Sequence, residues 1–204
     1  MVTKYGFSDV REHLIEDLKG AYPTKWEDFE AAKVLGENVF GSPKPHPNAV
    51  LNLFLQQSVK FALPFAAYRA SLGGLLALVG DEPSTALPRP TLASITNGIG
   101  MIRQAVALAV HDICTRCLGV CAEGACALKV SADHLEALKI FGMMFARSEG
   151  GPLAPLSLGT LVCMACAKRL EKVHLGYRKE LVWPELPSLL GWESWEEVEG
   201  FPCV

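Results

Sequence analysis

Residues 114–126 read Cys-Thr-Arg-Cys-Leu-Gly-Val-Cys-Ala-Glu-Gly-Ala-Cys, and residues 163–166 read Cys-Met-Ala-Cys. Each stretch contains a pair of cysteines separated by two residues, and together they hold six of the seven cysteines of the chain. Such a pair lets one tight turn supply two thiolates to a tetrahedral metal ion, and zinc favours these soft ligands. The two clusters therefore predict a structural zinc site that clamps two distant segments of the chain together.

The candidate ligands outnumber the four that zinc requires. The first pair, followed by Gly119, is similar to a zinc knuckle, in which glycine lets backbone amides approach the sulfur. The second pair is predicted at the start of a helix, where the helix dipole and the unbonded amides favour thiolates. The sequence leaves the choice open among Cys114, Cys117, Cys121, Cys126, Cys163 and Cys166.

Two other interpretations of these cysteines remain. Free cysteine is among the most buried residue types, so the six could be small core residues. A redox pair of the thioredoxin kind would need a preceding strand, and no alternating strand pattern is visible. His111 stands three residues before Cys114 and could replace one thiolate, although a histidine in such a place is more often a capping or surface residue.

Hydrophobic residues recur at helical spacing along most of the chain. From Thr91 to about Ile113 an apolar residue returns every three or four positions, although Asn97-Gly98 could divide this helix because glycine costs about 1 kcal/mol in a helix interior. A second long helix is predicted from about Leu158 to Val182, and Ser194-Trp-Glu-Glu197 is a capping box that begins a short last helix. The pattern predicts an all-α protein, built as an irregular helical bundle.

Composition sets the broad class of the protein. Half of the 204 residues are hydrophobic and 20% are charged, so the chain can build a sizeable core. We expect a helical bundle over residues 1–110 and a cysteine-rich helical subdomain over residues 111–204. The formal net charge of −3 gives no general attraction to nucleic acids or anionic membranes.

Nothing in the sequence predicts export or insertion into a bilayer. No signal peptide is visible at Met1. The most apolar stretch, residues 61–80, is interrupted by Pro64 and Arg69 and is better explained as a buried helix than as a membrane span. Clustered cysteines without a secretion signal indicate a reducing compartment, so we expect the protein in the cytoplasm or the nucleus.

No catalytic motif is present. The chain lacks a P-loop, a Gly-x-Gly-x-x-Gly loop on a strand and a His-Glu-x-x-His pair, so we expect no enzyme. A thiol enzyme or a small-molecule binder is an alternative that a reactive thiol would support. A nucleic-acid-associated regulator is a second alternative, although the acidic pI counts against it; it would use the basic residues of the last long helix: Lys168, Arg169, Lys172, Arg178 and Lys179.

Several motifs resemble the region that follows the BTB/POZ domain in the large set of such proteins from mushroom-forming fungi. The resemblance covers nearly the whole chain and is best at its end. The motifs that carry it are Leu18-x-x-Ala21-Tyr-Pro-Thr24, His46-Pro47, Leu63-Pro64-Phe-Ala-Ala-Tyr68, Leu161-Val-Cys163-x-x-Cys166, Val182-Trp183-Pro-Glu-Leu186-Pro187 and Trp192-x-x-Trp195-Glu-Glu197.

The resemblance implies a helical region that is BACK-like in its first half. It also implies Cys121 and Cys126 as the partners of Cys163 and Cys166, and the Cys114–Cys117 pair is then a departure from the family. The BTB/POZ fold itself is absent from this chain, so its dimerisation and its recruitment of cullin-type ligases do not carry over.

We therefore expect a non-catalytic protein–protein interaction or adaptor module. Zinc would fasten its C-terminal third, tying the segment after the central helix to the start of the last long helix. Its partner is expected to be a protein, bound in a groove between helices or by the tryptophans near the C-terminus.

Overall fold

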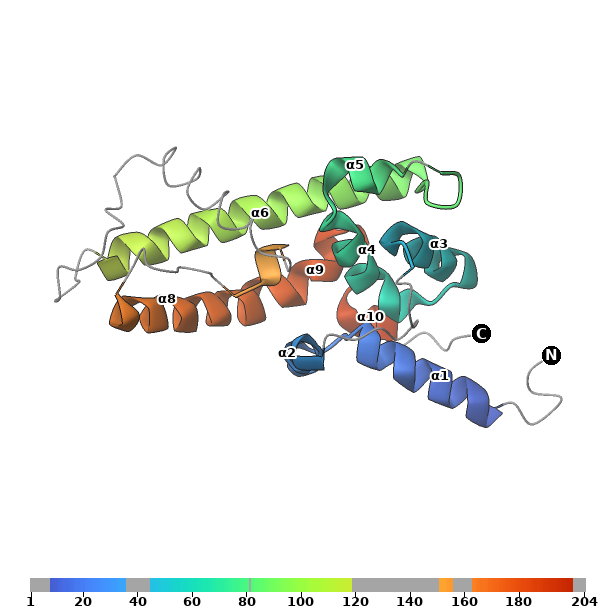
Figure 1. The fold of residues 1–204 in the computed structure, drawn as a ribbon, viewed down its shortest axis with the longest axis horizontal. Coiled ribbons are helices and arrows are strands. Elements are labelled where there is room, and N and C mark those ends of the chain that lie inside the picture. The colour runs from blue at the N-terminus through green and yellow to red at the C-terminus, as the bar shows by residue number, and fades with distance from the viewer. Residues whose placement is uncertain (1–7, 36–44, 81, 119–150, 156–162, 200–204) are drawn as a thin grey trace. The chain divides into compact units, whose positions relative to one another are not determined.

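The structure is a computed structural model that describes residues 8–35, 45–80, 82–118, 151–155 and 163–199. Every regular element within these ranges is a helix, which confirms the predicted all-α class (Figure 1). The chain groups into two compact units, Met1–Thr96 with Leu186–Val204 and Asn97–Glu185. This grouping differs from the expected division into residues 1–110 and 111–204. The expected division stays a prediction.

The first unit is a bundle of short helices. Within it α1 packs on α2, α3 packs on α4, and α4 packs on α5, while α10 contacts the 3-10 turn η2. Its elements are α1 (Ser8–Ala21), α2 (Trp26–Leu35), α3 (Pro47–Gln57), η2 (Lys60–Ala62), α4 (Leu63–Ser71), α5 (Gly74–Val79) and α10 (Trp195–Glu199).

Local signals in the sequence explain where these helices begin. The imidazole Nδ1 of His46 accepts a hydrogen bond from the backbone amide of Asn48 at 3.2 Å. Pro47 occupies the first turn of α3, where its missing N–H costs nothing. The predicted capping box before α10 is confirmed. The Ser194 amide donates to Glu197 Oε2 at 3.0 Å, and the Glu197 amide donates to Ser194 Oγ at 3.4 Å.

Aromatic side chains join the turn between α1 and α2 to α3 and α4. The ring of Tyr22 meets Phe54 edge-on with centroids 4.8 Å apart, and Phe29 meets Phe65 edge-on at 5.6 Å. Such edge-to-face pairs stabilise a core by about 0.5–1.5 kcal/mol beyond the area they bury. Burial raises the pKa of Tyr22 above its ordinary value of 10.0, and the nearby Arg69 offsets part of this rise.

Two asparagines one turn apart on α3 hold α5 and the loop that follows it. Asn48 is fully buried, and its Nδ2 donates to the carbonyl oxygens of Ala77 at 2.8 Å, Leu78 at 3.0 Å and Thr85 at 3.0 Å. Nδ2 of Asn52 donates to the carbonyl oxygens of Ser84 and Ala86 near the surface. These bonds satisfy carbonyls at the C-terminus of α5, which has no further helical turn to do so.

The second unit consists of long helices, two of which continue into the first unit. Helix α6 passes from the first unit into the second between Thr96 and Asn97, and α9 returns to the first between Glu185 and Leu186. The elements are α6 (Arg89–Leu118), the 3-10 turn η3 (Gly151–Leu153), α8 (Met164–Tyr177), the π-helical turn η5 (Arg178–Val182) and α9 (Trp183–Leu189).

Helix α6 is continuous over thirty residues. Its predicted apolar row is confirmed, since Ile95, Ile99, Ile102 and Val106 are all buried. No break occurs at Asn97-Gly98, because burial of this row outweighs the cost of about 1 kcal/mol for one glycine. The helix also extends past Ile113 to Leu118, so the prediction of a tight turn at the first cysteine pair is wrong.

Helix α8 continues through η5 into α9 without interruption. The amide of Trp183 donates to the carbonyl of Arg178, five residues earlier, which is the hydrogen-bond pattern of a π-turn. Pro184 explains this widening, because it has no N–H for the carbonyl four residues before it and its ring would collide with that carbonyl in a regular helix. The helix therefore extends beyond the predicted end at Val182. It begins at Met164, after the extended backbone of Cys163, so the predicted start near Leu158 is wrong.

Candidate metal centre

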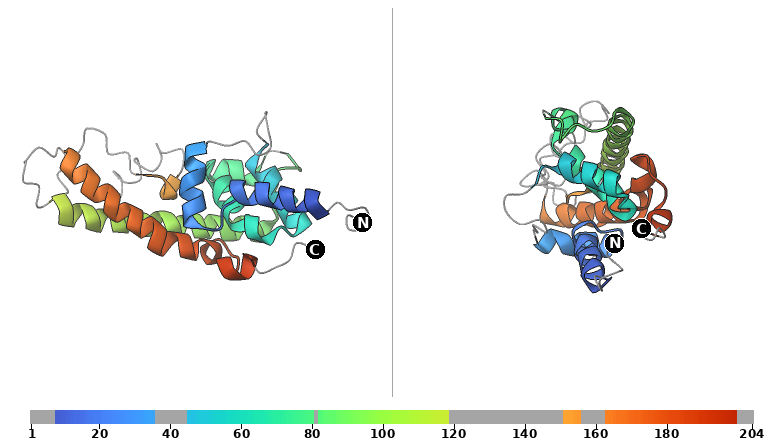
Figure 2. Two further views of the ribbon diagram at one scale, coloured as in Figure 1. Left: turned by 90° about the horizontal axis from the view of Figure 1, so that it is seen from below. Right: turned by 90° about the vertical axis from the view of Figure 1, so that its right-hand side faces the viewer.

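Within the second unit α6 and α8 run in opposite directions and cross at an angle (Figures 1 and 2). The phenol of Tyr177, at the end of α8, donates a hydrogen bond to the carbonyl oxygen of Ala105 on α6 at 3.1 Å. Burial raises the pKa of Tyr177 above its ordinary value of 10.0. This bond fixes how the two helices are aligned along their length.

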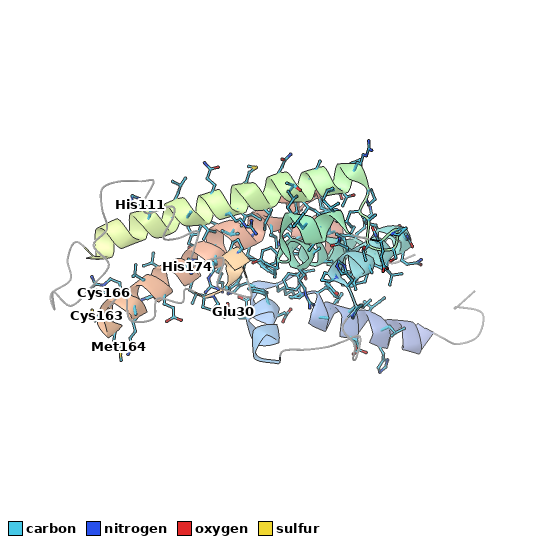
Figure 3. All side chains as sticks on the ribbon, turned by 45° about the horizontal axis from the view of Figure 1, so that its top comes forward. Glu30, His111, Cys163, Met164, Cys166 and His174 are labelled. Atoms are coloured by element: carbon cyan, nitrogen blue, oxygen red, sulfur yellow. The ribbon has the colours of Figure 1, made fainter. Side chains whose placement is uncertain are left out.

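The second cysteine pair lies at the start of α8, as predicted. Cys163 is the N-cap residue, with an extended backbone at φ −67° and ψ 158°, and Cys166 is in the first turn. Cys163 is half-buried and Cys166 is buried, at 5% exposure. Figure 3 shows both at the start of α8. The positive end of the helix dipole favours thiolates at this place.

The side chains of the other four candidate ligands are not described. Cys114 and Cys117 lie in the last two turns of α6, and their side chains are not described. Cys121 and Cys126 lie outside the described residues. Among the side chains that are described, no three histidines, cysteines or acidic residues gather as metal ligands, and this set contains only the second of the two cysteine pairs. The zinc site therefore stays a prediction.

A row of buried residues follows Cys166 along α8. Its members recur every four residues: Leu170, His174 and Arg178. The last two are polar, and the sequence pattern did not predict their burial. The guanidinium Nη1 of Arg178 donates to the carbonyl oxygen of Leu153 at 2.5 Å, which binds η3 to the helix. Arg178 therefore does not belong to the solvent-exposed basic face, which retains Lys168, Arg169, Lys172 and Lys179.

His111 lies on α6 one turn before Cys114 and is half-buried (Figure 3). Its role as a metal ligand stays a prediction.

A second feature with functional potential is the outer face of α5 in the first unit. The sequence of this helix, Gly-Leu-Leu-Ala-Leu-Val, contains no polar side chain. Leu78 is buried, but Leu75 and Val79 are more than half exposed and Leu76 is 87% exposed. We call these three exposed residues the α5 surface. The prediction of a buried helix over residues 61–80 is therefore wrong for the α5 surface.

No protein-family model, curated protein or solved structure matches this chain. Within the ranges that the structure describes, no helix is both long and apolar enough to cross a membrane.

Proposed function

We propose that the chain is a non-catalytic protein–protein interaction module of the cytoplasm or nucleus, with a structural zinc site in its second unit. The observation that carries the interaction role is the α5 surface. Three large aliphatic side chains exposed on one short helix are unfavourable in water unless a partner covers them.

The attachment of α5 supports its use as a binding surface. The buried side-chain amide of Asn48 donates to two carbonyls at the end of α5, so the helix is held in one position without a bound partner. A preorganised apolar surface loses little conformational entropy on binding. The partner that fits is an amphipathic helix of another protein, whose apolar face would cover Leu75, Leu76 and Val79.

The motifs that resemble fungal BTB/POZ proteins favour the same role. That resemblance implies a BACK-like helical bundle in the first half of the chain. The lack of a catalytic motif in the sequence agrees with this assignment, and we assign no reaction to the chain.

The zinc site is supported by the two cysteine pairs and by the position of the second pair at a helix N-terminus. Thiolate ligands need a reducing compartment, which is the reason for placing the protein in the cytoplasm or nucleus. The metal would stabilise the second unit and take no part in chemistry.

The interaction role is tested by placing a photo-crosslinking amino acid at Leu76 in the cells that make the protein. The matched control is Gln57, an exposed polar residue of α3 in the same unit. We expect a crosslinked protein of defined mass at position 76 and none at position 57, and we expect Leu76→Asp to lose the complex while keeping its helical circular dichroism. A chain that migrates at its own 22.1 kDa in cell extract and gives no adduct at position 76 would refute the proposal.

A further inference from the structure

We infer that Cys163 and Cys166 form a site of oxidative modification, in which Cys163 reacts first with a small disulfide and Cys166 then closes a disulfide within the chain. The chemistry needs no metal, so the inference goes beyond the proposed function. It concerns a pair that the proposed function assigns to zinc, and a closed disulfide has no thiolate with which to bind that metal.

The two cysteines occupy the two positions of a helix start whose side chains meet. Cys163 is the N-cap residue of α8 and the helix begins at Met164, so Cys166 is its third residue. In a capping box the side chains of these two positions reach toward each other across the first turn. The amide of Ala167 donates to the carbonyl oxygen of Cys163 at 2.9 Å, which closes that turn.

The start of α10 shows the same two positions in contact. Ser194 precedes the first residue of α10, and Glu197 is its third. Oγ of Ser194 donates a hydrogen bond to Oε2 of Glu197 at 3.1 Å. Cα atoms three residues apart in a helix are separated by about 5 Å, and a disulfide spans Cα separations of about 4.4–6.8 Å. Cys163 and Cys166 therefore suit a disulfide while α8 stays helical, and no preceding strand of the thioredoxin kind is required.

The two thiols differ in their access to solvent. Cys163 is half-buried, whereas Cys166 is buried. Met164, the residue that follows Cys163, is 76% exposed, so the start of α8 is open to solvent on this side. An oxidant therefore meets Cys163 first, and Cys166 is the thiol that completes the disulfide.

The reaction is a two-step thiol–disulfide exchange with a low-molecular-weight disulfide such as oxidised glutathione. The Cys163 thiolate attacks one sulfur of glutathione disulfide, so that a mixed disulfide forms and one glutathione thiolate leaves. The Cys166 thiolate then attacks Sγ of Cys163 and expels the second glutathione. The pair loses two electrons and two protons, which convert one glutathione disulfide into two glutathione molecules. This reaction modifies the chain, which is its reactant and not its catalyst.

The test treats the full chain with glutathione disulfide, in the presence of added zinc or of a zinc chelator. Iodoacetamide then labels the remaining thiols, and trypsin digests the protein. Cleavage after Arg147 and Lys168 releases a peptide whose only cysteines are Cys163 and Cys166. In the chelator we expect this peptide to be unlabelled and lighter than its reduced form by two hydrogen atoms, because a disulfide joins its two cysteines.

Two variants separate the roles of the two thiols. In Cys166→Ser we expect the mixed disulfide with glutathione to accumulate on Cys163. In Cys163→Ser we expect Cys166 to react about tenfold more slowly than Cys163 does, because it is buried. Serine is a favourable N-cap residue, so Cys163→Ser keeps the start of α8, and circular dichroism checks that both variants stay helical.

The outcomes distinguish this inference from the zinc proposal. A wild-type peptide that stays fully labelled, or that is joined to another cysteine of the chain, overturns the pair. Equal reactivity of the two cysteines in the variants overturns the order of attack. We expect added zinc to slow the reaction; a reaction equally fast with zinc and with the chelator contradicts zinc binding by this pair, and leaves the disulfide inference standing.

Discussion

Asn48→Ala tests whether one buried amide holds α5 and its loop on α3. The two hydrogens of Nδ2 serve three carbonyl oxygens at 2.8–3.0 Å, and the side chain is fully buried. Each neutral hydrogen bond contributes about 1 kcal/mol, and a buried acceptor left without a donor costs about 1–3 kcal/mol. Because alanine leaves three acceptors without this donor, we expect the free energy of unfolding to fall by about 2–4 kcal/mol.

The matched control is Asn52→Ala, one turn further along the same helix. Its two hydrogen bonds, at 3.0 and 3.2 Å, are exposed, so water replaces them and the expected loss is about 0.5 kcal/mol or less. Urea unfolding followed by circular dichroism measures both variants, and an unchanged dependence on urea concentration shows that only stability differs. Equal losses in the two variants would refute the argument that burial makes Asn48 the anchor.

Three further predictions concern single residues. Gly80→Ala should lower the free energy of unfolding by about 2–3 kcal/mol, because φ is +73° and the new Cβ would lie 2.6 Å from the Thr85 carbonyl oxygen. In Gly20→Ala, in α1, the new Cβ meets nothing within 4 Å, so this variant should raise the free energy of unfolding by about 0.5–1 kcal/mol. Thermal unfolding compares the two variants, and equal shifts would contradict the role of φ. Tyr22→Phe should reduce the loss of stability at alkaline pH. Because the folded-state pKa of Tyr22 is raised, its contribution to stability is complete below the unfolded-state pKa of 10.0 and falls as the pH rises through the folded-state pKa. Parallel pH profiles of unfolding in the two proteins would show that Tyr22 does not titrate in this way. Arg178→Met should lower the free energy of unfolding by about 2–3 kcal/mol through the lost charged hydrogen bond to Leu153. Lys172→Met, on the exposed side of α8, should change it by less than about 0.5 kcal/mol in urea unfolding.

The predicted features that are confirmed depend on local rules of helix formation. The spacing of Ile95, Ile99, Ile102 and Val106 identifies the buried side of α6, and Ser194 with Glu197 marks the start of α10. Both follow from contacts within a few residues, so one sequence contains enough information to predict them.

The features that were missed depend on residues far apart in the chain. Asn48 and Arg178 are polar, and a pattern of polar and apolar residues cannot distinguish a buried donor from an exposed one; their acceptors are 29 to 37 and 25 residues away. The extension of α6 through Cys114 and Cys117 was missed because a pair of cysteines predicts a turn as readily as a helix. The hydrogen bond between Tyr177 and Ala105 joins residues 72 positions apart, which no sequence motif connects.

The division of the first unit between the two ends of the chain has a consequence for its synthesis. The ribosome completes the second unit at residue 185, whereas the first unit still lacks Leu186, Leu190 and Val198, all of them buried. The aromatic cluster of α1 to α4 is thus made early but remains without its last helices until residues 186–199 have been made. A stop codon just after residue 185 would leave the earlier-made unit incomplete, with apolar surface open to chaperones and proteases.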